Sequence, residues 1–289
     1  MKPLVTAVGA VCVLAFVVNA QQQPQTGNAA LRYWMAFAVL QDAPADAATT
    51  DLLQRVADGS APWDEARLGP ILRANAEALA IMDRASTLRS CDWGIEYDLG
   101  PHAPIPHLAR GRVLGRLSVL SGMRLAARGE TSEAVDRWLA AIRFSQHLAE
   151  GGTLISLLSA NSVLLPSLRA LADEVSRLNP ESRARIDADL RALPDTGFDW
   201  PNAMVQEERA LIAGVRMNAV PNLRSQDLGT LHTTVSQIVD ALRLPPDRAR
   251  TALTSVKLGS MPFPSPIRVN EQREVIRTAR QKVLDALAR

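Results

Sequence analysis

Residues 106–171 contain three long helical patterns in succession, and only short turns with glycine separate them. The first pattern runs from Pro106 to Arg128 and repeats small residues on one narrow sector of the expected helix surface: Gly111, Gly115, Ser118 and Gly122. A glycine inside a helix costs about 1 kcal/mol relative to alanine, so three glycines on one face need a compensating contact. We therefore expect another helix to pack closely on this face, with the 106–128 helix at the centre of the fold.

The turn at Gly129 predicts a helical hairpin. Gly129 suits the left-handed position after a helix, and Thr131 or Ser132 can cap the helix that follows. In the second helix, 131–150, Trp138 can fill the groove between the two helices. The hairpin presents small and large residues in a characteristic order: Gly122, Leu125, Gly129, Ala134, Trp138 and Ala141. In these positions it resembles a tetratricopeptide repeat, and the resemblance covers about 34 residues, 115–148.

The rest of the chain also predicts helices. Alternating apolar and polar runs are missing, and aromatic residues make up only 4% of the chain, which argues against β-strands. No second copy of the hairpin follows at the same period, so we expect no regular solenoid. We predict an all-α fold, an irregular array of antiparallel helical hairpins in a single domain, 28–289. Its helices include 28–41, capped by Asn28, then 70–88, 153–178 with a kink or break at Pro166, and a helix that Asn179 caps.

The N-terminus has the pattern of an export signal. Lys2 precedes an apolar run of 15 residues from Leu4 to Val18, and small residues lead to Ala20. We predict a signal peptide, 1–20, followed by a polar linker, 21–27, and a periplasmic or extracellular location. A membrane span needs about 20 apolar residues, so an uncleaved anchor is the alternative. We expect contact with a membrane only through such an uncleaved segment.

The charge balance argues against nucleic-acid binding. Without Lys2 the chain has 31 basic and 30 acidic residues, and no recognition motif or basic-aromatic interleaving is present. Residues 107–129 contain five arginines and no acid, while residues 28–100 contain 11 acids and 6 arginines. We expect these two segments to neutralise each other through ion pairs. An anionic ligand bound by the arginines of residues 107–129 is the alternative.

The loop from Cys91 to Pro106 holds most of the reactive side chains. Six of them could bind a metal, but their spacing matches no established metal motif: Cys91, Asp92, Glu96, Asp98, His102 and His107. We predict no metal site and no cofactor. We interpret Cys91 as a buried free thiol or as half of a disulfide between two chains, with nucleophilic catalysis beside a histidine as the alternative. Trp93 and Tyr97 are expected to anchor the loop to the helices.

Two functional hypotheses follow. The first is an exported scaffold or protein-binding module, with a groove between the 106–128 and 131–150 helices and the 91–106 loop at one edge. Its expected binding residues are Arg112, Arg116, Trp138, Trp93 and Tyr97. The alternative is a hydrolase of a cell-envelope polymer that uses Glu207 or Glu208. Adjacent helical residues point about 100° apart, so this pair would need another carboxylate opposite one of them.

Overall fold

The computed structural model describes residues 27–42, 46–259 and 261–289, so the predicted signal peptide lies outside the described residues. Within these ranges the chain forms twelve α-helices and three 3₁₀ helices, and no β-strand. An isolated bridge between Asn28 and Ser90 is the sole β-type pairing among them. The predicted all-α class is confirmed.

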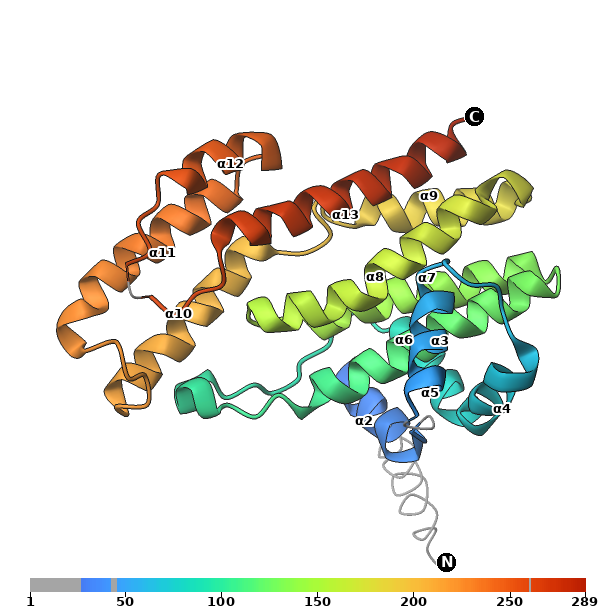
Figure 1. The fold of residues 1–289 in the computed structure, drawn as a ribbon, viewed down its shortest axis with the longest axis horizontal. Helices are drawn as coiled ribbons and strands as arrows, with labels where there is room; N and C mark the ends of the chain where they lie inside the picture. Colours follow the sequence, from blue (N-terminus) through green and yellow to red (C-terminus); the bar gives the residue numbers. More distant parts are fainter. Residues whose placement is uncertain (1–26, 43–45, 260) are drawn as a thin grey trace, which may run out of the picture.

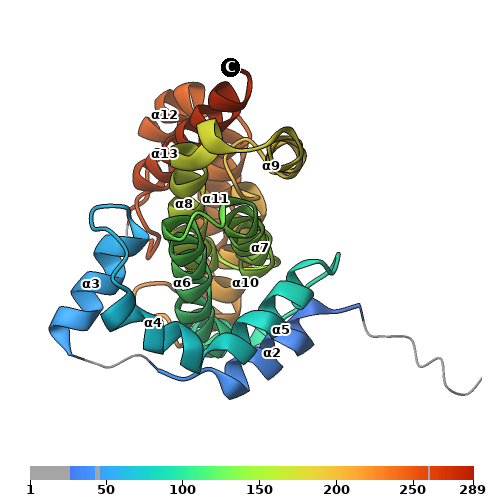
Figure 2. The ribbon, with the colours of Figure 1, turned by 90° about the vertical axis from the view of Figure 1, so that its right-hand side faces the viewer.

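The first four helices form an N-terminal layer along the lower and left-hand sides of the fold in Figure 2. They are α2 (Ala29–Val39), α3 (Ala47–Ala57), α4 (Glu65–Ala74) and α5 (Ala76–Ser86). The Asn28 side chain accepts a hydrogen bond from the Ala30 N–H, which confirms the predicted cap of α2. Helix α2 packs on α5, while α3 and α4 contact α6 (Pro106–Ala127).

The predicted single helix over 70–88 is wrong. The chain forms a helix from Glu65, with Pro70 inside it, and a second helix begins after Asn75. The buried Asn75 side chain accepts from the Gln41 N–H at 2.8 Å and donates to the Gln41 carbonyl at 3.1 Å. This contact with the chain after α2 holds Asn75 at the break between α4 and α5.

Helix α6 is central and closely packed, as the glycine face predicts. Its partners are α7 (Thr131–Ala149) and α8 (Leu154–Glu174). A methyl group on Gly111 would meet Leu148 at 2.7 Å, and one on Gly122 would meet Trp138 at 2.3 Å. Since the start of α6 meets the end of α7, the two helices run in opposite directions. Gly129, with φ of 78°, makes the turn between them.

Helix α8 is continuous through Pro166, so the predicted break there is absent. With the 3₁₀ helix η3 (Val175–Arg177) it forms a stretch long and apolar enough to cross a membrane. Its most apolar window is 67% buried among the other helices, as in the core of a helical domain. We interpret α8 as a core helix for this reason.

The C-terminal helices wrap the other side of this core. They are α9 (Pro180–Ala192), α10 (Trp200–Arg216), α11 (Leu228–Leu242), α12 (Pro246–Thr254) and α13 (Pro266–Leu287), with η4 (Ser225–Asp227) before α11. Asn179 caps α9, as predicted. Helix α13 returns across α8 and α9 (Figure 1). The loop after α5 contains the 3₁₀ helix η2 (Tyr97–His102), which packs on α10 where Gly100 meets Gly214.

Candidate functional site

The three aromatic residues expected to bind a partner hold the fold together instead of facing one groove. Trp138 is 1% exposed and donates its indole N–H to the Val119 carbonyl. Trp93 is half-buried and donates to the His147 carbonyl at 2.7 Å. The Tyr97 hydroxyl donates to the Gly151 carbonyl at 2.5 Å. The loop is therefore anchored on the end of α7 as predicted, and close packing fills the space between α6 and α7.

The expected neutralisation of the α6 arginines is confirmed for three of the five. Arg110 pairs with Asp42 at 2.9 Å, and Arg124 and Arg128 both pair with Glu65. Arg112 and Arg116 form no ion pair within the part of the chain that the structure describes. Arg116 is half-buried, and its burial and the neighbouring Arg112 lower the pKa of its guanidinium.

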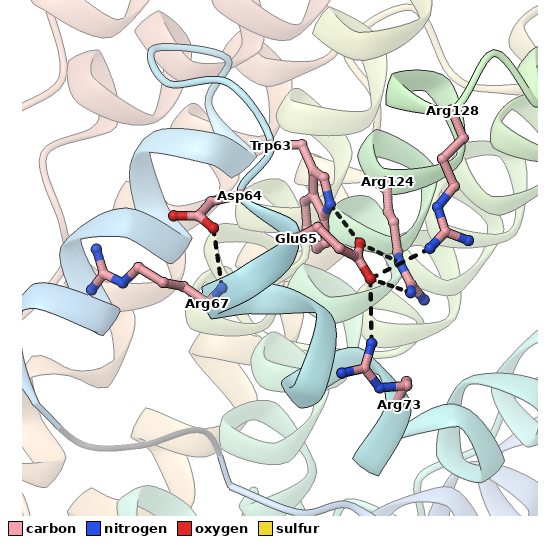
Figure 3. Close-up of polar contacts among 7 residues, drawn as sticks. All are labelled: Trp63, Asp64, Glu65, Arg67, Arg73, Arg124 and Arg128. Carbon is pink, nitrogen blue, oxygen red and sulfur yellow. Dashed lines mark hydrogen bonds and ion pairs between the residues drawn. The ribbon is translucent and has the colours of Figure 1, made fainter.

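Glu65 is the centre of the arginine cluster that ties α4 to α6 (Figure 3). Its carboxylate accepts from Arg124 at 2.5 and 2.8 Å, from Arg73 at 3.3 Å and from the Trp63 indole at 2.9 Å. Arg124 first, then the Trp63 indole and the charge of Arg128, lower the pKa of Glu65 to about 2. Because the carboxylate already occupies the centre of the cluster, we interpret it as a structural tie.

Glu207 and Glu208, the predicted catalytic candidates, form hydrogen bonds with different helices. Glu207 accepts a hydrogen bond from the Leu154 N–H at 3.3 Å, at the first residue of α8, and its burial raises the pKa of its carboxyl. Glu208 contacts His232 of α11, with 2.8 Å between Oε1 and Nδ1. The two carboxylates therefore do not form a facing pair.

The Glu208–His232 contact lies beside a cavity of about 290 Å³. Arg209 and Arg216 also line it, and Arg209 pairs with Asp98 at 3.1 Å. A histidine next to a carboxylate is a common arrangement for proton transfer, because the carboxylate orients the ring and stabilises its protonated form. This cavity is thus a second candidate site, although Glu207 has no part in it.

The larger candidate site is a groove along α7. Two cavities of about 480 and 300 Å³ share Gln146 in their lining. The first lies between the end of α5, α7 and α9, and the second lies between the end of α7 and the start of α10. We call the surface that lines these two cavities the Gln146 groove. Its walls include Arg143 and Asp189, which pair at 2.5 Å, and Glu150, whose pKa is raised by burial.

Polar atoms at the centre of the Gln146 groove include one free donor. Gln146 Nε2 is buried and has no hydrogen-bond partner among the described atoms. Its neighbour His147 is buried and contacts the Tyr33 hydroxyl through Nδ1 at 2.7 Å. Burial lowers the pKa of His147, so the neutral ring accepts the Tyr33 proton at Nδ1. Gln146 therefore has an unpaired amide donor, and the histidine next to it in the chain is uncharged and held by Tyr33.

Cys91 is buried and free, and burial raises the pKa of its thiol. A thiol of this kind is a poor nucleophile, because the thiolate is the reactive form. Among the residues placed by the structure, no three of His, Cys, Asp and Glu gather in a metal-binding arrangement.

Comparison with family models, with curated proteins and with solved structures finds no match for this chain.

Proposed function

We propose that this chain is an exported helical binding module, and that the Gln146 groove binds an extended segment of a partner protein. The observation that carries the proposal is the buried, unpaired Nε2 of Gln146, a residue that lines both cavities of the groove. A buried donor without a partner costs about 1–3 kcal/mol, and an acceptor from a ligand would remove this cost. An extended peptide presents a backbone carbonyl at every residue.

The groove suits a peptide better than a small cofactor. The second cavity is lined by small and apolar residues, among them Ala149, Gly151, Gly152 and Phe198, together with the carboxylates of Glu150 and Asp199. Arg143 and Asp189 line the first cavity. Apolar walls with a few polar groups give a peptide affinity and register together. The proposal includes export by the predicted signal peptide. In the tetratricopeptide-like hairpin, α6 packs on α7, and α7 forms one wall of the groove.

A displayed library of random peptides, selected on the wild-type chain, tests the proposal. Ala192 is exposed and lines the groove at the end of α9, so Ala192→Trp should fill the groove without disturbing the core. Selected peptides should bind this variant at least about tenfold more weakly. Ala184→Trp, at an exposed position of α9 away from the groove, should bind them normally. Peptides that bind Ala192→Trp as well as wild type, or the absence of any selected peptide, would contradict the proposal.

The second candidate function is hydrolysis of a cell-envelope polymer, and the Glu208–His232 contact favours it. A hydrolase of this kind would release soluble fragments from insoluble envelope polymer. The release should then be lost in Glu208→Gln and His232→Gln but kept in Glu207→Gln, because Glu207 lies outside the cavity. If the wild-type chain releases no fragments, this candidate is excluded and the binding module stands alone.

A further inference from the structure

Helix α2 is apolar on both of its faces. One face is buried against α5 and α7 and contains Ala29, Ala30, Tyr33, Ala36 and Phe37. The other face is a row of exposed apolar side chains, which we call the α2 stripe: Leu31, Trp34, Met35, Ala38 and Val39. Leu31 is 52% exposed and Met35 is 61% exposed. A helix that is apolar all round needs a cover on each face, and the described part of the fold covers only one.

The α2 stripe is continuous and lies at the edge of the molecule. Its members follow one another at alternating steps of three and one residues, which places them on one side of the helix. In both views α2 lies on the outer side of the N-terminal layer, away from α13 (Figures 1 and 2). The stripe is therefore open to a large flat partner such as a membrane surface.

The size of the α2 stripe argues against a second copy of the chain as its cover. Side chains that are 36–61% exposed along a helix of this length present on the order of 300 Å² of apolar surface. A stable interface between two proteins buries about 800 Å² on each partner. An interfacial helix needs no such area, because the bilayer surrounds each inserted side chain separately.

The chain before α2 favours a lipid bilayer. The apolar run that ends at Val18 is separated from α2 by only ten residues, 19–28, so α2 is the first described helix after a segment suited to a membrane. Trp34 is a residue type enriched at the boundary between lipid tails and water. Arg32 of α2 and the exposed Arg89, which adjoins the Ser90–Ala29 contact, have no ion pair among the described residues. Both guanidiniums are free to contact lipid phosphates.

We propose that α2 lies in the interface of a lipid bilayer, with the α2 stripe inserted among the lipid chains. This docking requires neither peptide binding in the Gln146 groove nor an uncleaved N-terminal segment. It would keep the folded domain at the membrane surface after removal of residues 1–20.

Flotation with vesicles of phosphatidylethanolamine and phosphatidylglycerol tests this proposal. The core described above is built from residues after Gly27, so we use the chain that begins at Gln21 and lacks the apolar run. The wild-type chain should float with the vesicles. Trp34→Gln combined with Met35→Gln should lower the bound fraction at least about tenfold, since both side chains belong to the stripe. Met217→Gln combined with Val275→Gln changes two exposed apolar residues elsewhere and should float like wild type.

A second readout locates the helix directly. An environment-sensitive fluorophore attached at Met35→Cys should shift to the blue when vesicles are added, whereas the same label at Met217→Cys should not. Cys91 is buried and should not compete for the label. A wild-type chain that does not float, a stripe variant that floats equally well, or a Met35→Cys label that stays in water would each overturn the proposal. A wild-type dimer that the stripe variant abolishes, without flotation, would assign the stripe to a second copy instead. The Ala192→Trp variant should still float, which separates this proposal from the peptide groove.

Discussion

At the scale of single residues, the absence of a side chain at Gly122 decides how closely α6 and α7 approach. A methyl group there would lie 2.3 Å from Trp138 Nε1, and the Trp138 ring is buried on all sides. Gly122→Ala should therefore lower the free energy of unfolding by about 1–3 kcal/mol, although alanine is the better helix former. Urea denaturation measures this change.

Gly229 provides the matched control for Gly122. It lies in the first turn of α11, is exposed, and has no atom within 4 Å of an added methyl group. Gly229→Ala should raise the free energy of unfolding by up to about 1 kcal/mol, because it restricts the unfolded chain. Equal effects of the two substitutions would show that close helix packing does not constrain position 122.

Residue-level predictions from the sequence succeed where the interaction is local. Asn28 and Asn179 each cap the helix that begins directly after them, so their neighbours alone identify them. Asn75 could not be predicted in this way, because Gln41, its hydrogen-bond partner, lies 34 residues away. Without that contact, the apolar spacing on both sides of Asn75 looks like one helix.

At the scale of elements, Glu207 of α10 caps the first turn of α8. The Thr153 side chain makes no cap there, and the Glu207 carboxylate accepts the Leu154 N–H instead. Glu207→Ala should cost about 1–2 kcal/mol because it leaves this N–H without an acceptor. Glu207→Gln keeps an acceptor and should be neutral or stabilising at pH 7. The pKa of the Glu207 carboxyl is raised in the folded chain, which means that folding disfavours its charged form. At pH 7 the charge therefore lowers the stability of the fold, and the neutral amide removes this cost.

Thermal unfolding of the two Glu207 variants at pH 7 measures these changes in stability. Equal losses in both variants would mean that the negative charge, and not the hydrogen bond, stabilises α8. Neither result would depend on catalysis, so this experiment is independent of the envelope-polymer assay.

Glu65 joins two other elements, α4 and α6. Glu65→Gln should weaken its bonds to Arg73 and Arg124, because a neutral amide attracts guanidinium groups less strongly. We expect amide hydrogens of α4 to exchange faster while those of α8 keep their protection. Asp240→Asn, which breaks an exposed pair with Arg243 inside one turn, is the control and should leave α4 unchanged. Unaltered exchange in Glu65→Gln would show that apolar contacts alone hold α4.

The candidate site could not be predicted from the sequence, although most of the helices around it could. The Gln146 groove combines residues from α5, α7, α9 and α10, and each of them is an ordinary helix or loop residue. Gln146 becomes unusual only when burial removes its amide from water. Glu207 and Glu208 are adjacent carboxylates in the sequence, but their hydrogen-bond partners, Leu154 and His232, belong to other helices.

At the scale of the whole molecule, charge is balanced between segments that are distant in the sequence. The opposite charges of 28–100 and 107–129 predict pairing, and Asp42 and Glu65 provide it for Arg110, Arg124 and Arg128. The sequence cannot say which arginines remain unpaired, because this depends on which helix faces each of them. Arg112 is exposed and Arg116 is half-buried, and neither lines the Gln146 groove.

The stability of the whole molecule should fall in mild acid because of His107. This residue is 2% exposed, stacks on Trp93 with 4.4 Å between ring centres, and has an unpaired Nε2. Burial lowers its pKa to about 4 from the ordinary 6.5. Between these two pH values the unfolded chain binds a proton at His107 and the folded chain does not. The fold therefore has its full stability above pH 6.5, and it loses stability as the pH falls toward 4. At 1.36 kcal/mol per pKa unit the loss is up to about 3 kcal/mol.

Urea denaturation at several pH values between 7 and 4 measures this loss. His107→Phe keeps an aromatic ring against Trp93 and removes the proton site, so its free energy of unfolding should depend less on pH than that of wild type. His102→Gln changes an exposed histidine of η2 and should keep the wild-type slope. If His107→Phe retains the full slope, the acid sensitivity comes from His147, whose pKa burial also lowers, or from the carboxylates. In that case the contact between the 91–105 loop and α6 does not respond to pH, and the loop should stay anchored on α7 in mild acid.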